Sequence, residues 1–433
     1  MSTITLYKSV PVRATYDCIV CGGGCAGFVA AISAARAGLR TALIERYGFL
    51  GGTATAGYVV PISGFYFKGE RVVGGIAWEF VKRLEKQGAA LVELPKGHVS
   101  VHPENYKVVA EQMVEESGVE MYTNTMLIDC LAEDGKISHV VLNDKSGTYA
   151  LAAETFIDAT GDGDLAYMAG APMRSADSGT MQPLSLCFVI ENTDATTDLL
   201  KNCIHHNGRD AKQSVNSVIH EYLQSCPDAP QFGGPWFNTL LLGNSLAVNV
   251  PRAGCDATDP RAFAAAERKL RRDMFKIIEL LRARFPEFKD SAVVSSAINA
   301  GIRETRHLIG KGTATLQSFL DGTTYACPAA HSAHPMDIHD PKSSAQQLIR
   351  LENNAYVPCD ALVCEQLDNL IVAGRCLSAE AGPYASVRVQ ATLMSTGEAA
   401  GLMAKLSCDS NTPTHALNEE LLSAMILARH FVL

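Results

Sequence analysis

The feature that most constrains the fold of this chain is a glycine-rich loop that joins two apolar runs. Residues 16–21 (YDCIVC) lead into GGGCAG, and the alanine-rich stretch 28–37 follows. Gly38 then stops the helical pattern, and residues 41–44 (TALI) form a second apolar run that ends at Glu45. This order predicts a βαβ unit of about 30 residues, in which a crossover helix joins two parallel strands.

The glycines of this loop, Gly22, Gly24 and Gly27, have the spacing G-x-G-x-x-G. The first permits a tight turn, the second lets a diphosphate approach the backbone, and the third lets helix and strand pack closely. Cys25 and Ala26 lie between them, so their amides open the helix, whose N-terminal dipole attracts anions. We interpret the segment as a dinucleotide-binding loop.

The acidic residue at the end of the second strand strengthens this interpretation. Glu45 follows the last glycine of the motif by 18 residues, where a carboxylate can accept hydrogen bonds from both hydroxyls of a ribose. The next segment, RYGFLGGTATAG, begins with Arg46 and contains Gly51, Gly52 and Thr53. Such a loop allows close approach of a ribityl chain or a flavin ring, which NAD lacks. The pattern therefore favours FAD over NAD.

Length, charge and cysteine usage limit the remaining possibilities. A chain of 433 residues exceeds a single core, so two or three interlocked domains are expected. The net charge of −9 disfavours a nucleic-acid partner. We expect a cytoplasmic protein, because no run approaches the roughly 20 apolar residues of a membrane span and the 13 cysteines are scattered. Cys18 and Cys21 point to opposite faces of the predicted strand and cannot pair there.

Further along the chain, the sequence predicts four elements. Residues 137–142 and 148–152 flank the turn NDKSG and predict a hairpin. Apolar residues recur every three or four positions from 263 to 281, which predicts a helix that ends before Pro286. Residues 369–374 predict a buried strand, and the small residues of 386–404 predict a helix.

Three blocks of the sequence resemble the FAD-dependent oxidoreductase family of the two-dinucleotide-binding-domain flavoproteins, which is related to the glutathione-reductase-like flavoproteins. These blocks are YDCIVCGGGCAG…LIERYGFLGGTATAG, TFIDATGDGDLA and LDNLIVAGRCLSAEAGPYASVRVQATLMSTGEAAG. GIRETRHLIGKG and HPMDIHDP add to the resemblance, and the blocks follow the family's order. The segment GFLGGTATAG lacks the cysteine pair of disulfide reductases, so we do not expect disulfide reduction.

The resemblance implies six further residues at the cofactor: Gly161, Asp162, Gly374, Arg375, Val389 and Gln390. The first pair would lie beside the dinucleotide, the second near the ribityl and phosphate groups, and the third at a helix N-terminus that points to the pyrimidine edge of the flavin. A helix N-terminus there stabilises the negative charge of reduced flavin. A metal site in the acidic loop DATGDGD is the alternative, although its spacing differs from that of an EF-hand.

The resemblance and the element order predict an α/β fold, with a Rossmann-like FAD-binding domain and an inserted α+β substrate domain. The FAD-binding domain would be discontinuous and comprise residues 1–60, 98–172 and 355–433. The substrate domain would comprise residues 61–97 and 173–354.

The densest group of acid–base side chains lies in CPAAHSAHPMDIHD, which contains Cys327, His331, His334, Asp337 and His339. These histidines either are structural, bind a metal, or exchange a proton with substrate beside the flavin. Relatives usually carry Tyr before the proline of this block, where this chain has His334. We therefore predict His334, followed by His331, as catalytic residues, and we predict no metal ligands.

Two arginines in GIRETRH, Arg303 and Arg306, are candidates for a bidentate clamp on a substrate carboxylate. The alternative is an intramolecular ion pair with Glu304 or a contact with a helix C-terminus. We include Arg303 among the catalytic candidates. Tyr384 and Arg388 lie in the loop before the C-terminal helix. Each of them either faces the flavin or packs against the protein interior.

The sequence thus predicts an enzyme that exchanges a hydride between flavin N5 and a small organic substrate. No second well-placed G-x-G-x-x-G occurs, so NAD(P)H or another external electron carrier would bind transiently. A monooxygenase or oxidase, and a non-catalytic redox sensor or subunit, are the alternatives. The direction of transfer, the substrate and assembly into a homo-oligomer stay open.

Overall fold

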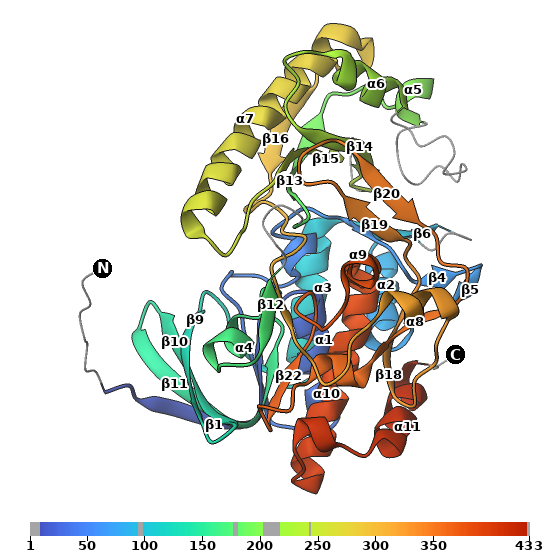
Figure 1. Ribbon diagram of the computed structural model, residues 1–433. Helices are drawn as coiled ribbons and strands as arrows, with labels where there is room; N and C mark the ends of the chain where they lie inside the picture. Colours follow the sequence, from blue (N-terminus) through green and yellow to red (C-terminus); the bar gives the residue numbers. More distant parts are fainter. Residues whose placement is uncertain (1–8, 94–97, 176–180, 202–216, 242–243, 431–433) are drawn as a thin grey trace.

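The computed structural model describes residues 9–93, 98–175, 181–201, 217–241 and 244–430. Figure 1 shows an elongated molecule in which a sheet with several packed helices occupies the lower part and a second sheet with a long helix occupies the upper part. None of the helices in the described ranges is both long and apolar enough to cross a bilayer.

The lower sheet is mixed, and its strands follow the order β8-β2-β1-β11-β10-β9, with β22 also paired to β11. β1, β2, β8, β11 and β22 pair in parallel. The predicted βαβ unit is confirmed, because β1 and β2 are joined by helix α1. The bounds are β1 Val12–Cys21, α1 Cys25–Arg36, β2 Thr41–Ile44, β8 Glu120–Tyr122, β9 Met126–Glu133, β10 Lys136–Asp144, β11 Gly147–Asp158 and β22 Leu370–Val372.

Strand β11 pairs with β1 along one edge, and because it is long it pairs with two strands along the other. Its first half pairs antiparallel with β10, which confirms the predicted hairpin, and its last three residues pair in parallel with β22. The loops after β1, β11 and β22 consequently meet at one edge of the sheet. Ligands of open α/β sheets bind at this carboxyl edge. The predicted α/β fold with a Rossmann-like sheet is confirmed.

Helix α10 packs along α1 at very short range. An ideal Cβ on Gly397 would lie 2.2 Å from the carbonyl oxygen of Ala26, and one on Gly401 would lie 2.6 Å from Cβ of Ser33, so only glycine permits this approach. The helix predicted for 386–404 is interrupted, because the extended backbone of Val389 separates two helices. The bounds of the helices on this part are α2 Gly75–Lys86, α3 Pro103–Glu116, α4 Asp164–Met168, α9 Ala381–Val387, α10 Gln390–Ser410 and α11 Glu419–His430.

The upper sheet is antiparallel, in the order β14-β15-β13-β16, and helix α7 covers it. The predicted amphipathic helix is confirmed as α7, which Asp259 caps through the amides of Arg261 and Ala262. Leu270, Ile277 and Leu281 bury its apolar stripe in a separate core. The bounds are β13 Leu184–Glu191, α5 Asp198–Lys201, α6 Ser217–Ser225, β14 Phe232–Thr239, β15 Leu246–Ala253, α7 Pro260–Arg284 and β16 Ala292–Ser296.

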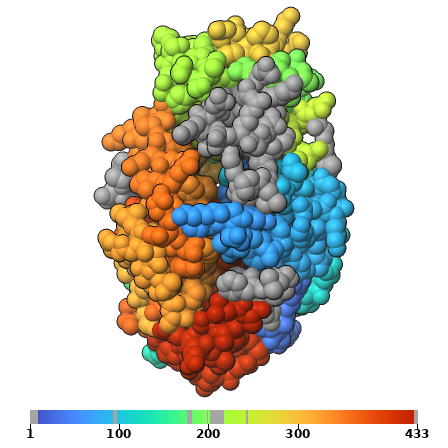
Figure 2. Space-filling view, turned by 90° about the vertical axis from the view of Figure 1, so that its right-hand side faces the viewer, coloured from blue at the N-terminus to red at the C-terminus, as the bar shows by residue number. Residues whose placement is uncertain are grey.

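Short strands fill the space between the two sheets. In Figure 2 the blue hairpin β4–β5 reaches toward the orange segment that contains β18 to β21, where Lys68 donates to the carbonyl of Glu352 at 2.6 Å. The division into the two predicted domains, with its boundaries, stays a prediction. The bounds are β3 Pro61–Ile62, β4 Tyr66–Phe67, β5 Glu70–Arg71, β6 Ala90–Glu93, β7 His98–Val101, β12 Met173–Ser175, β17 Arg306–Leu308, α8 Leu316–Asp321, β18 Pro328–Ser332, β19 Met336–His339, β20 Gln346–Ile349 and β21 Ala355–Pro358.

Candidate active site

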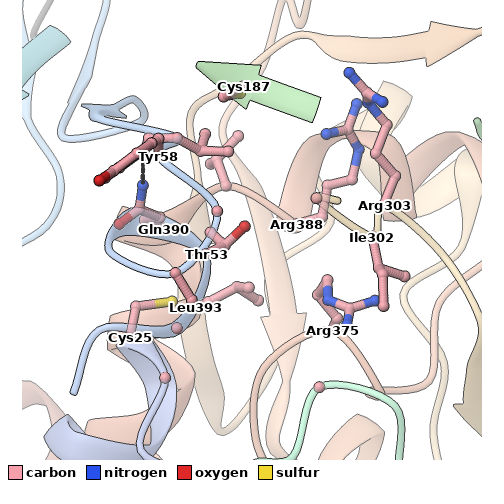
Figure 3. Close-up of a pocket in the computed structure, with 18 of the residues that line it drawn as sticks. Cys25, Thr53, Tyr58, Cys187, Ile302, Arg303, Arg375, Arg388, Gln390 and Leu393 are labelled. Carbon is pink, nitrogen blue, oxygen red and sulfur yellow. Dashed lines mark hydrogen bonds between the residues drawn. The ribbon is translucent and has the colours of Figure 1, made fainter. Parts of the chain in front are cut away.

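A cavity of about 370 Å³ lies between the glycine loop and the upper sheet. Figure 3 shows Cys25, Thr53 and Gln390 on one side of it and Arg303 and Arg388 on the other. Most predicted cofactor residues line this cavity: Gly22, Gly24, Cys25, Ala26, Glu45, Arg46, Gly52, Thr53, Gly161, Asp162, Gly374, Arg375, Val389 and Gln390. Gly27 and Gly51 do not line it.

The three motif glycines have the conformations and contacts that the sequence predicts. Gly22 turns with φ 101°, a value that side chains rarely adopt. An ideal Cβ on Gly27 would lie 1.7 Å from the carbonyl oxygen of Gly22, so Gly27 shapes the turn from behind. A Cβ on Gly24 would meet only the Cα of Gly52, at 4.0 Å. The space beside Gly24 is therefore part of the cavity.

The N-terminus of α1 opens into this space. Gly24 is its N-cap, and no side chain caps the helix. Gly51, with φ 108°, donates its amide to the carbonyl of Gly23 at 2.9 Å, which holds the second glycine loop against the first. Backbone amides at an uncapped helix start bind phosphate groups.

Glu45 has a second task that the sequence does not reveal. Its two carboxylate oxygens accept hydrogen bonds from the amides of Gly23, at 2.6 Å, and Tyr47, at 2.9 Å. Burial raises the pKa of Glu45, and these two amides oppose the rise. Each carboxylate oxygen retains a lone pair for another donor. Glu45 therefore both fixes the loop and lines the cavity.

The loops after β11 and β22 are joined by an ion pair at the cavity wall. Arg375 Nη2 lies 2.9 Å from Asp162 Oδ1, which also accepts a hydrogen bond of 2.7 Å from Thr305. Burial alone would raise the pKa of Asp162, but the charge of Arg375 and these hydrogen bonds lower it overall. The buried Nη1 of Arg375 has no hydrogen-bond partner in the described part of the chain. That donor fits a phosphate oxygen.

The start of α10 presents a matching acceptor. Val389 is the N-cap, and Gln390 donates its Nε2 to the carbonyl of Val59 at 2.8 Å. The buried Oε1 of Gln390 has no partner among the described residues. An amide oxygen together with a helix N-terminus fits the edge of a flavin, which carries both an N–H group and oxygen acceptors.

The carboxylates of the acidic loop DATGDGD bind groups of the protein itself. Asp158, fully buried, accepts hydrogen bonds from Thr160 and from the amide of Ala166. Asp164 pairs with Arg306, and burial followed by repulsion from Asp162 raises the pKa of Asp164 to about 6. Among the residues described here, no group of three or more potential ligands is arranged to hold a metal ion.

The predicted histidines separate into two positions. His334, Asp337 and His339 line the cavity, whereas His331 does not. His331 stacks on Tyr356, with ring centroids 4.9 Å apart, and it also contacts Phe67. Burial lowers the pKa of His331 to about 4, which keeps its ring neutral. Its catalytic role stays a prediction.

The other two histidines differ in their hydrogen bonds. Nδ1 of His334 lies 2.8 Å from the carbonyl oxygen of Pro335, so this nitrogen carries the proton and Nε2 is the acceptor of the neutral ring. Burial lowers the pKa of His334. His339 is enclosed between Arg252 Nη2, at 2.7 Å, and Asp337, at 3.0 Å. His339 therefore links Arg252 to Asp337, whereas Nε2 of His334 has no hydrogen-bond partner among the described residues.

Of the two predicted clamp arginines, only Arg303 lines the cavity. Arg306 instead pairs with Asp164 and donates to the carbonyl of Asp162, because β17 directs it to the acidic loop. The alternative, an ion pair of either arginine with Glu304, does not occur among the described residues, where Glu304 contacts His307 at 3.3 Å. The hydroxyl of Tyr384 donates a hydrogen bond of 2.6 Å to the carbonyl of Arg303. Tyr384 is buried and does not line the cavity, so it packs behind Arg303.

Sequence reasoning missed the residues that the upper sheet contributes. Cys187, Asn249 and Trp236 are paired across β13, β15 and β14, and all three line the cavity. Asn238, two residues after Trp236, lines it as well. The sequence did contain a signal for them, because each of two apolar strands carries one asparagine. Asn238 lies on the same face of β14 as Trp236, which pairs with Asn249 of β15. Arg388 was considered from the sequence and also lines the cavity.

Residues 17–426 match the family described as FAD dependent oxidoreductase. A stretch of 46 residues is 56% identical to a dihydrolipoyl dehydrogenase of Trypanosoma brucei brucei; it covers 11% of this chain and 10% of that enzyme. The match thus spans about a tenth of the length of this curated relative.

Three solved structures have a similar course of the chain. A geranylgeranyl bacteriochlorophyll reductase-like protein of Thermoplasma acidophilum is 14% identical, with 96% of this chain and 84% of that chain covered and a TM-score of 0.49. A flavoprotein/dehydrogenase of Cytophaga hutchinsonii is 13% identical, with 95% and 82% covered and a TM-score of 0.49. A p-nitrophenol 4-monooxygenase of Pseudomonas putida is 11% identical, with 97% and 85% covered and a TM-score of 0.47. These likenesses are too distant to indicate a reaction.

Proposed function

The chain belongs to the family of FAD dependent oxidoreductases, and we propose that it exchanges a hydride between the flavin of FAD and a small organic substrate. FAD is the cofactor. The observation that carries the proposal is that one cavity joins two features. The uncapped start of α1 lies on one side of it, and on the other side lies His334, whose Nε2 has no hydrogen-bond partner among the described residues. When bound, FAD supplies the hydride-accepting or hydride-donating nitrogen N5.

The cofactor side of the cavity supports FAD through unpaired groups and open backbone. The start of α1 and the space beside Gly24 would receive the diphosphate, and Glu45 would accept hydrogen bonds from the adenosine ribose. Arg375 Nη1 would donate to a phosphate oxygen, and Gln390 Oε1 would accept from the flavin edge. Ordinary protein interiors leave few such polar atoms unpaired.

The substrate side supports proton transfer by His334. Removal of a hydride from a carbon that bears a hydroxyl or amino group requires a base for the proton of that group. His334 is neutral because burial lowers its pKa, and its bond to Pro335 leaves Nε2 as the acceptor. In the opposite direction the same nitrogen would return the proton. Asp337, which Arg388 and His339 engage, favours the protonated ring that forms during transfer.

Electrons have to enter or leave through a second reactant. We infer that NAD(P)H or another carrier visits the cavity transiently. The support is the sequence, which contains one well-placed dinucleotide motif rather than two.

An anaerobic screen tests the proposed function. The yellow holoenzyme is mixed with members of a metabolite library, or with NADH or NADPH, and the flavin absorbance is followed. Bleaching by an alcohol or amine, or by a nicotinamide with reoxidation by an unsaturated or carbonyl compound, is the expected result. A flavin that NADH or NADPH reduces, and that on admission of oxygen is reoxidised with hydroxylation of the added compound, would instead identify a monooxygenase. A flavin that no compound reduces would identify a sensor.

A further inference from the structure

The end of the cavity away from the glycine loop carries an excess of buried positive charge. Arg303 and Arg388 line the cavity there, and Arg252 contacts the cavity-lining His339. Arg303 and Arg252 are 9% and 0% exposed, and the side chain of Arg388 is 14% exposed. Among the described residues, one carboxylate forms an ion pair with this cluster: Asp337, which lies 3.6 Å from Arg388. Within the described part of the chain, neither Arg303 nor Arg252 has an acidic partner within ion-pair distance.

Nearby acidic groups do not balance this excess. Glu304 is occupied by His307 and by the amide of Gln182. Asp340 is exposed and accepts hydrogen bonds from the amides of Lys342 and Ser343. Buried charge without a counterion is costly, so such a cluster is retained where a ligand supplies the missing charge. Burial and the charges of Arg252 and Arg388 lower the pKa of Arg303, as expected for a cation without an anion.

The arginines at the cavity retain donors for such a ligand. Arg303 uses Nη1 for the carbonyl of Pro183, at 2.6 Å, and no other hydrogen bond of its guanidinium occurs among the described residues. Arg388 uses Nη2 for the carbonyl of Asp337, at 2.8 Å, and its buried Nε has no partner in the same part of the structure. Two guanidinium groups with open donors suit the two oxygens of a carboxylate.

The facing wall carries the complementary pattern. Asn238 and Asn249 line the cavity from strands β14 and β15, and the buried Oδ1 of each has no hydrogen-bond partner within the described ranges. These strands are paired in register, with Trp236 opposite Asn249, so both amides lie within one small patch of the sheet. Two unpaired acceptors in a row fit a ligand that donates from hydroxyl groups.

We propose that the substrate of this enzyme is a small hydroxy carboxylate. Its carboxylate binds Arg303 and Arg388, and its hydroxyl groups donate to Asn238 and Asn249. The proposed function enters this inference only where the ligand is called the substrate. The binding site itself is inferred from the unpaired donors of the two arginines and the unpaired acceptors of the two asparagines. Arg252 does not line the cavity and is a positioning residue, because it holds His339, which in turn holds Asp337 beside Arg388.

Binding of matched acids and amides to the holoenzyme tests this site without turnover. The probes are tartrate, malate and lactate, each compared with its amide, which keeps the hydroxyl groups but loses the charge. Binding is measured by calorimetry and by the shift of the flavin absorbance bands. We expect at least one acid to bind about 30-fold or more tightly than its amide, because charge-assisted hydrogen bonds are the stronger kind. Equal binding of every acid and its amide, or no binding of any acid, would overturn the proposal.

Variants locate the site. Arg303→Gln and Arg388→Gln should each weaken binding of the acid by about 10- to 100-fold and leave binding of the amide nearly unchanged. Asn249→Leu should weaken acid and amide alike, because it removes an acceptor for the hydroxyl groups. Arg268→Gln, at an exposed position of α7, is the matched control and should change neither. Retention of FAD checks folding, and an unchanged acid affinity in both folded arginine variants would contradict the assignment.

The two proposals fail in different ways. If hydroxy carboxylates bind as predicted but none reduces the flavin, and their oxo counterparts do not reoxidise it, hydride exchange is wrong and the anion site stands. If a neutral compound reduces the flavin while no carboxylate binds, hydride exchange stands and the substrate class is wrong.

Discussion

The carboxylate of Glu45 accepts a hydrogen bond of 2.6 Å from the backbone amide of Gly23. This contact ties the end of β2 to the glycine loop that follows β1, and Glu45 reaches the cavity at the same time. We therefore expect Glu45 to influence cofactor binding both directly and through the shape of the loop.

Glu45→Ala should weaken FAD binding by about 10- to 100-fold, because it removes an acceptor for the ribose and releases the amides of Gly23 and Tyr47. The measurement is a fluorescence titration of the apoprotein with FAD. Glu133→Ala, at the exposed end of β9, is the control. Equal affinities of the two variants would show that Glu45 does not contribute.

Gly24→Val should fold but lose FAD. The backbone of Gly24 has φ −67° and ψ −176°, which valine adopts readily, and the space for the side chain is the cavity itself. The variant should be colourless after purification and should unfold like the wild-type apoprotein. A yellow protein would contradict the position assigned to the diphosphate.

Gly27→Ala is the contrasting change in the same motif. Its Cβ would lie 1.7 Å from the carbonyl oxygen of Gly22, so α1 would have to move away from the sheet. We expect a loss of about 3 kcal/mol or more of unfolding free energy, measured on the apoproteins by urea titration. A stable Gly27→Ala protein would mean that this contact is not tight.

Asp162→Asn should destabilise the fold by about 3 kcal/mol, because it leaves Arg375 without its charge partner in a largely buried site. The pKa of Asp162 is lowered in the folded protein, so its contribution is present above about pH 4 and is lost as the pH falls through the folded value. Urea unfolding near neutral pH gives the effect, and Asp290→Asn, at an exposed position, should show none.

His334→Ala should leave FAD bound and slow flavin reduction by substrate by about 100-fold or more. Because the pKa of His334 is lowered, its ring stays neutral at pH 7, and reduction by the wild type should decline only below pH 6.5. Stopped-flow reduction rates measured over pH test both points. His139→Ala, on β10 outside the cavity lining, is the control. An unchanged rate in His334→Ala would remove this residue from the mechanism.

Buried neutral histidines should make the fold sensitive to mild acid. Burial lowers the pKa of His331 to about 4 and that of His339 to about 3, whereas both titrate near 6.5 when unfolded. The unfolded chain therefore binds more protons below pH 6.5, and stability falls as the pH is lowered from there. His331→Phe should reduce this pH dependence, since phenylalanine fits between Phe67 and Tyr356 without a titrating group. Unfolding midpoints that match the wild type at every pH would contradict this account.

The cofactor side was predictable from the sequence because its information is local. Gly22, Gly24, Gly27 and Glu45 occupy one βαβ unit, and each is required there by backbone conformation or by a short-range contact. In such a motif the local sequence determines the local backbone conformation. The loops of Gly161 and Gly374 needed the family resemblance, because they reach the cavity only through pairing of β11 with β1 and β22.

The substrate side was decided by tertiary structure. Arg306 lies three residues from Arg303 yet turns to the acidic loop, and His331 lies three residues from His334 yet is buried in an aromatic stack. Neighbours in a short strand or irregular loop point in different directions, so sequence proximity does not select the one that faces the cavity. Asn238 and Asn249 join the arginines only because an antiparallel sheet from the middle of the chain packs over the glycine loop. Short-range backbone requirements thus determined the proposed cofactor site, and long-range packing selected the side chains that line the proposed substrate site.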